Sequence, residues 1–105
     1  MAKLRIELGP CDDAGEVWVN GALALETGLD QVETYSMKLD DGQHRVKFRL
    51  NNKGAWGWTA NVRILLDGQV IGSVLNESGG TGAWAGYIKE VEKVWSFEIA
   101  GGVRV

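Results

Sequence analysis

Two pairs of neighbouring aspartates are the clearest candidates for metal chemistry in this chain of 105 residues. Asp12 and Asp13 form one pair, and Asp40 and Asp41 form the other. Calcium takes about six to eight hard oxygen ligands, so carboxylates from neighbouring loops make a structural calcium ion a candidate. The alternative is that aspartate is simply favoured in turns, where its side chain caps the backbone. EF-hand spacing is absent from the sequence, and no other cofactor is predicted.

Three tryptophans occupy positions that suit ligand binding. Trp56 and Trp84 lie in or beside glycine-rich stretches, and Trp18 has the opposite parity from Val17 and Val19. Exposed aromatic rings stack on the apolar face of a sugar or anchor a protein partner. The predicted ligand-binding residues are therefore these tryptophans and nearby amides: Trp18, Trp56, Trp84, Asn51, Asn52 and Asn76. The alternative is that the aromatic rings close the ends of a small β-fold. Trp58 and Trp95 share the phase of apolar runs and are predicted to be core residues.

Basic residues form one row, Arg45, Lys47 and Arg49, with Arg63 as a candidate on a neighbouring strand. Basic rows with interleaved aromatic rings can bind single-stranded nucleic acid. The chain is acidic as a whole, with a net charge of −3. The alternative, a solvated strand face paired with acidic residues, is therefore preferred, and no nucleic-acid or membrane partner is predicted.

Catalytic groups are few. His44 is the only histidine and Cys11 the only cysteine, and neither comes with an evident third group or oxyanion site. The sequence therefore predicts a protein that is not an enzyme, with a small hydrolase kept as the residual alternative. A lone thiol, no signal-peptide pattern and no long apolar run favour a soluble protein of the cytoplasm or of a virion.

Alternation of apolar and polar residues dominates the chain and indicates strands. His44, Val46, Phe48 and Leu50 face one way and the basic row faces the other. Similar alternation predicts that Val62, Ile64 and Phe97 lie in the core with Val46 and Phe48. No stretch carries a continuous helical stripe, and 86–95 is predicted to be a strand pair or a single helical turn.

Asparagine–glycine and aspartate–glycine pairs predict tight hairpin turns at 20–21, 41–42 and 67–68. The implied hairpins join 16–19 to 22–26, 32–39 to 43–50, and 58–66 to 69–75. Two long loops are expected, at 51–57 and 76–86. Eight or nine short antiparallel strands in one domain, residues 1–105, predict a two-sheet β-sandwich.

The stretch 11–21, which reads CDDAGEVWVNG, resembles the acidic hairpin of galactose-binding-like jelly rolls. Leu39 to Val46 resembles that family's strand entry, and Leu50-Asn51-Asn52 with Gly54, Gly57 and Trp58 resembles its strand exit. The resemblance covers about residues 3–71. It implies a jelly-roll sandwich of the carbohydrate-binding type, such as modules attached to glycosidases, surface proteins and phage tails, in which loops carry a structural calcium.

Two functions follow as hypotheses. The first is a non-catalytic module that binds carbohydrate through tryptophans at one end of the sandwich. The alternative is a structural or assembly protein, a phage or bacterial surface component, that self-associates through strand edges. A homo-oligomer with Trp18 in its interface is predicted, and its other partner is a carbohydrate or a protein.

Overall fold

The computed structural model describes residues 2–11, 14–28, 31–52, 58–79 and 89–105. Within these ranges there are nine strands and no helix. The strands are β1 (Ala2–Leu8), β2 (Ala14–Val19), β3 (Ala22–Thr27), β4 (Glu33–Leu39), β5 (Gly42–Asn52), β6 (Trp58–Leu66), β7 (Gln69–Gly79), β8 (Lys89–Ala100) and β9 (Val103–Arg104). The prediction of an all-β fold with eight or nine strands is confirmed.

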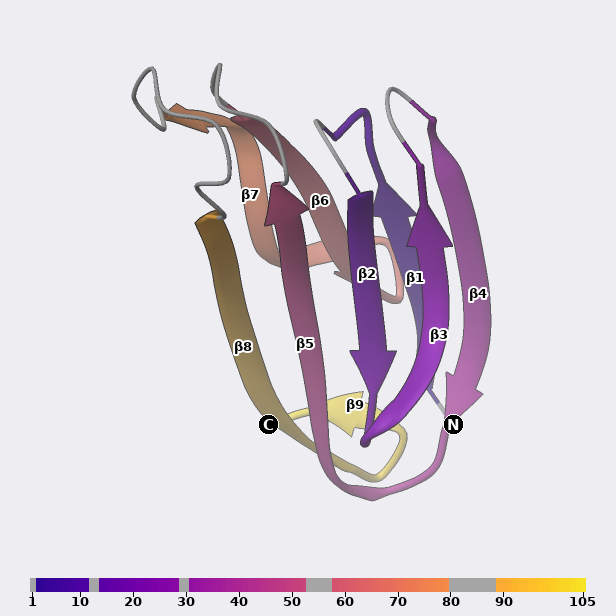
Figure 1. Cartoon of the computed structure of the whole chain (residues 1–105). Helices are drawn as coiled ribbons and strands as arrows, with labels where there is room; N and C mark the ends of the chain where they lie inside the picture. The colour runs from indigo at the N-terminus through magenta and orange to yellow at the C-terminus, as the bar shows by residue number, and fades with distance from the viewer. Residues whose placement is uncertain (1, 12–13, 29–30, 53–57, 80–88) are drawn as a thin grey trace.

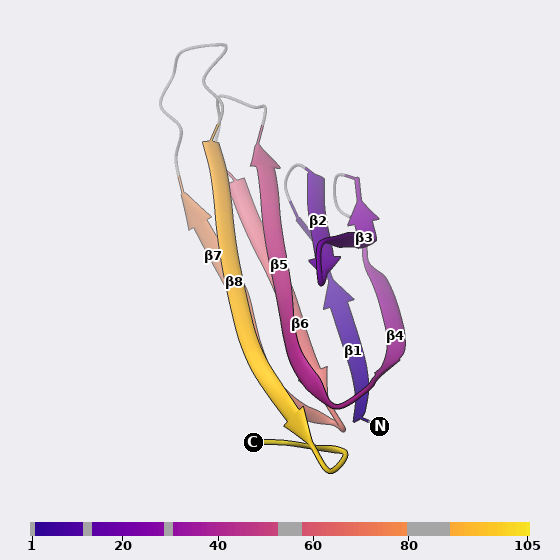
Figure 2. The same ribbon diagram turned by 90° about the horizontal axis from the view of Figure 1, so that it is seen from below.

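The strands form two antiparallel sheets that face each other as a sandwich (Figures 1 and 2). One sheet has the order β4-β1-β6-β7, and the other has the order β3-β2-β5-β8-β9. Side chains of one parity from both sheets fill the space between them, because successive residues of a strand point to opposite faces. The five predicted core residues Val46, Phe48, Val62, Ile64 and Phe97 are all buried there.

Two of the predicted hairpins are present, β2–β3 and β6–β7. Their turns have positive φ at both central residues: 51° at Asn20 and 84° at Gly21, and 48° at Asp67 and 82° at Gly68. This is the conformation that asparagine–glycine and aspartate–glycine pairs favour.

The third predicted hairpin is wrong. The turn at 41–42 connects the two sheets: β4 pairs with β1, whereas β5 pairs with β2 and β8. Gly42 has a φ of 134°, but Asp41 is not among the residues with positive φ, so the two-residue hairpin turn does not form. The Asp41 carboxylate instead accepts hydrogen bonds from the backbone N–H groups of Gly101 and Gly102, each at 2.9 Å. The Asp41-Gly42 pair correctly predicted a change of chain direction, but it did not determine which strands would pair.

Strands also extend further than predicted. Asn51 and Asn52 belong to β5, and Asn76 belongs to β7, so these amides do not lie in loops. The described part of 86–95, from Lys89 onward, is strand β8, without a helical turn. Main-chain pairing continues past the apolar runs, because each backbone group gains a hydrogen bond whatever its side chain.

Trp95 is partly buried and packs against the core between the sheets. A Cβ added at Gly72 of β7 would lie 2.5 Å from Nε1 of Trp95, so glycine at this position lets the indole approach the opposite sheet. The core prediction for Trp95 is thus confirmed in part, while the side chain of Trp58 lies outside the described residues. None of the described residues forms a helix long and apolar enough to cross a membrane.

Candidate functional site

Trp18 lies on the outer face of the five-stranded sheet, as its parity predicted, and is half-buried there. A β-bulge separates it from Val17, where the pairing with β3 shifts. Bulges of this kind change the direction of a side chain relative to its neighbours. Leu23 of β3 lies opposite Trp18 on one side and is 50% exposed, and Lys47 of β5 lies opposite on the other.

The predicted basic row runs along β5 beside this tryptophan. Nζ of Lys47 lies 4.7 Å from the centroid of the Trp18 ring, and Cζ of Arg49 lies 5.1 Å from it. Cations at this distance over an indole attract its negative face, a contact that contributes about 0.5–1 kcal/mol at exposed sites. Trp18, Arg45, Lys47 and Gly21 together line a shallow hollow of about 140 Å³.

Asn20 fixes the position of this hollow. Its backbone N–H donates to the carbonyl of Arg45 at 2.8 Å, and its Oδ1 accepts from the backbone N–H of Arg45 at 2.9 Å. Its Nδ2 donates to Nδ1 of His44 at 3.0 Å, and Nε2 of His44 donates to the carbonyl of Asp40 at 2.7 Å. His44 therefore has both ring nitrogens in bonds that tie two turns together, and its ring packs beside Phe97 with centroids 5.8 Å apart.

Arg63 is not part of the basic row, contrary to expectation. It lies on β6 of the other sheet, where its Nε donates to Oε1 of Glu7 at 2.6 Å. This hydrogen bond, together with Arg5, lowers the pKa of Glu7. The expectation failed because strands of the same alternating pattern were divided between two sheets.

The predicted metal ligands are only partly described. Asp12 and Asp13 lie outside the described residues. Asp40 and Asp41 are exposed, and the bonds from Gly102 and Gly101 to the Asp41 carboxylate lower its pKa. Within the described ranges, no group of three or more His, Cys, Asp or Glu side chains could hold a metal ion. The calcium hypothesis therefore has no support from these residues.

The predicted sugar-binding loops lie mostly outside the described residues, since Trp56 and Trp84 are among those not described. Asn51 and Asn52 end β5 in one sheet, and Asn76 lies on β7 in the other, with their side chains also outside the description. Trp18 is not beside these asparagines: Asn51 pairs with Ala14, four residues earlier on β2 and so about 13 Å away along the strand.

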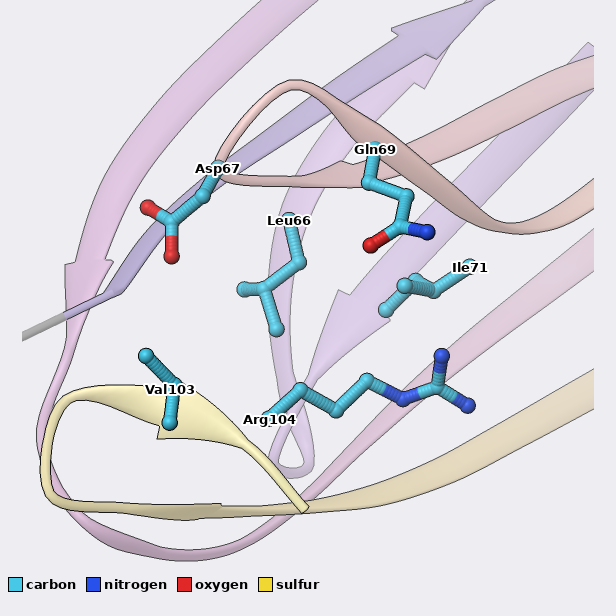
Figure 3. Close-up of a pocket in the computed structure, with 6 residues that line it drawn as sticks. All are labelled: Leu66, Asp67, Gln69, Ile71, Val103 and Arg104. Carbon is cyan, nitrogen blue, oxygen red and sulfur yellow. The ribbon is translucent and has the colours of Figure 1, made fainter.

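A second hollow, of about 230 Å³, lies at the end of the sandwich where β9 meets the β6–β7 turn (Figure 3). Figure 3 shows Leu66, Gln69 and Ile71 facing Val103 and Arg104 across it. Asp67, at its edge, accepts a hydrogen bond from the backbone N–H of Lys3 at 2.9 Å, and its own N–H donates to the carbonyl of Lys3. This aspartate thus has a structural role in anchoring the hairpin to β1.

The juxtaposition of Trp18 with the basic row was not predicted, because β5 pairs with β2, whereas a hairpin of β5 with β4 was expected. The shared outward parity of the two segments was the available signal.

No protein-family model matches the chain, and comparisons with curated proteins and with solved structures give no match.

Proposed function

We propose that the chain is a non-catalytic carbohydrate-binding module whose site is the Trp18 face, defined as Trp18, Gly21, Arg45 and Lys47. One observation carries this proposal: a partly exposed indole lies on an open sheet face beside a hollow lined with cationic hydrogen-bond donors. Trp56 and Trp84 are not part of this proposed site.

The chemistry of the Trp18 face suits a sugar. An aromatic ring offers an apolar surface to the C–H groups of a pyranose, while the guanidinium of Arg45 and the ammonium of Lys47 can donate to its oxygens. The hollow is smaller than the roughly 300–1,000 Å³ of pockets that enclose small ligands. A shallow site on a flat sheet is therefore better suited to one unit of a longer glycan than to a buried small molecule.

A glycan array followed by calorimetry on the hits tests this function. Single-site binding is expected to be weak, with a Kd of roughly 10–1000 μM, or about −4 to −7 kcal/mol. Trp18→Ala should abolish retention while the far-ultraviolet circular dichroism spectrum stays unchanged. Lys38→Ala on the outer face of the other sheet is the control and should bind as the wild type does. Absence of binding to every glycan would contradict the proposal.

The assembly hypothesis is the second candidate, and the sheet edges favour it. β7 ends one sheet, and among the described residues only Glu98, Ile99 and Ala100 of β8 are covered, by β9 and the N–H of Val105. Apolar side chains lie exposed on β7 and β8: Leu75 of β7 is 58% exposed, and Val94 of β8 is 46% exposed. Uncovered edges of this kind pair with other chains. Light scattering should then show a stable oligomer that Leu75→Lys on β7 disrupts. If Trp18→Ala disrupts it instead, the interface is the Trp18 face. A monomer at high micromolar concentration would count against assembly.

A further inference from the structure

We propose that the Trp18 face selects acidic carbohydrate, binding a sugar ring on Trp18 and that sugar's carboxylate or sulfate on Arg45 and Lys47. This inference rests on the proposed carbohydrate-binding function and adds the charge of the ligand to it.

The charges along β5 are compensated at one end of the row only. Arg49 lies opposite Glu16 of β2 on one side and opposite Glu92 of β8 on the other. One of its terminal nitrogens is 3.4 Å from Oε1 of Glu16. An anionic ligand would have to compete with these carboxylates, so Arg49 is poorly placed to attract one.

Arg45 and Lys47 have uncharged neighbours across the sheet. Lys47 lies between Trp18 and Val94, and Arg45 lies opposite Ser96, with Asn20 bonded to its backbone. Among the described residues, no carboxylate comes within salt-bridge distance of either cation. Two unneutralised positive charges therefore border the hollow beside Trp18, on a chain whose net charge is −3.

The positively charged segment of β5 is short, and this limits the number of acidic groups that a ligand can place on it. Beyond Arg45, the next outward residue on β5 is Gln43, which lies opposite Glu98. Beyond Lys47 come Arg49 and its two glutamates. The two cations are two residues apart, about 7 Å, which is room for one or two acidic groups. A long polyanion such as single-stranded nucleic acid would meet glutamates at both ends.

An acidic sugar can contact Trp18, Arg45 and Lys47 at the same time. The ring packs on the indole, and its carboxylate or sulfate accepts hydrogen bonds from the fork of Arg45 and from Nζ of Lys47. Charge-assisted hydrogen bonds of this kind are about twice as strong as neutral ones. Because the site is exposed, salt screens the attraction.

Isothermal calorimetry in the presence of EDTA with two matched pairs of glycans tests this inference. A digalacturonate is compared with its fully methyl-esterified form, and a sulfated disaccharide with the same disaccharide without sulfate. We expect at least tenfold tighter binding of one or both charged glycans than of the neutral partner. Raising the salt from about 50 to about 200 mM should weaken that binding roughly fivefold or more. The two pairs distinguish a carboxylate ligand from a sulfate ligand.

Variants assign the effect to the face. Arg45→Gln, which leaves the indole contacts of Lys47 and Arg49 in place, should weaken charged-glycan binding about tenfold, and Trp18→Ala should abolish it. Lys38→Gln, which removes one charge from the basic pair with Lys3 on the other sheet, should bind as the wild type does. Glu92→Gln should strengthen binding severalfold, because it removes a negative charge from the strand beside the basic row; a misfolded variant would not gain affinity.

Three results would overturn the inference. Equal binding of charged and neutral glycans would leave the carbohydrate function intact but remove its charge selectivity. Charged-glycan binding that survives Trp18→Ala and Arg45→Gln would show attraction to some other surface. Tighter binding of an oligothymidylate than of both charged glycans would assign the face to single-stranded nucleic acid. Absence of binding to any glycan, neutral or charged, would instead contradict the carbohydrate function itself.

Discussion

Phe48 lies fully buried between the two sheets, in the middle of β5. Replacing it with alanine removes most of its buried side chain and leaves a cavity that a rigid sandwich fills only partly. Phe48→Ala is therefore expected to lower the free energy of unfolding by about 3–5 kcal/mol, measured by urea denaturation. Val94→Ala on the exposed face is the control. A loss below about 0.5 kcal/mol for Phe48→Ala would mean that the site is not tightly packed.

The burial of Cys11 determines how fast its thiol reacts. Its side chain is 1% exposed, and its thiol lies 3.5 Å from the carbonyl of Asn61. Burial raises the pKa of this thiol, so both access and thiolate formation are unfavourable. Native protein at pH 7 is expected to react with Ellman's reagent far more slowly than unfolded protein, which should titrate one thiol per chain. Equally fast reaction in both states would contradict this burial.

In the β6–β7 hairpin, a two-residue turn fixes the register of the two strands. Gly68 has a φ of 82°, and a Cβ added there would meet nothing within 4 Å, so the cost of substitution is backbone strain alone. Gly68→Val should lower the free energy of unfolding by about 1–3 kcal/mol, and Gly68→Asn by less, because asparagine tolerates the left-handed region. Thermal denaturation of both variants measures the difference. Equal losses would argue against this turn type.

The Asp41 carboxylate connects two distant parts of the chain, the crossing between the sheets and the turn that precedes β9. The N–H groups of Gly102 and Gly101 lower its pKa, so the stabilisation is present above the unfolded pKa of about 3.9 and is lost as pH falls through the lower folded pKa. Asp41→Asn is expected to lower the melting temperature at pH 7. The difference from the wild type should shrink toward zero below about pH 3. Asp40→Asn is the control, and a difference that is independent of pH would contradict the linkage.

The local features of this protein follow from its amino-acid sequence alone. Alternation with a period of two depends only on neighbouring residues, so it predicted the strands, their inward faces and the outward position of Trp18 and the basic row. The turns at 20–21 and 67–68 were also predictable, because asparagine–glycine and aspartate–glycine pairs favour positive φ at both positions. The same preference at Asp41-Gly42 was overridden where β4 and β5 joined different sheets.

Which strands pair depends instead on how the whole sandwich packs. Leu39 and Gly42 are close in sequence, yet β4 and β5 belong to different sheets, since burying two apolar faces requires the chain to cross between layers. That crossing frees β5 to pair with β2, which puts Trp18 beside Lys47. The next strand, β6, belongs to the other sheet again, so Arg63 is separated from the basic row. The Trp18 face exists because strand pairing is a choice among distant segments with similar patterns, and the packing of the whole sandwich makes that choice.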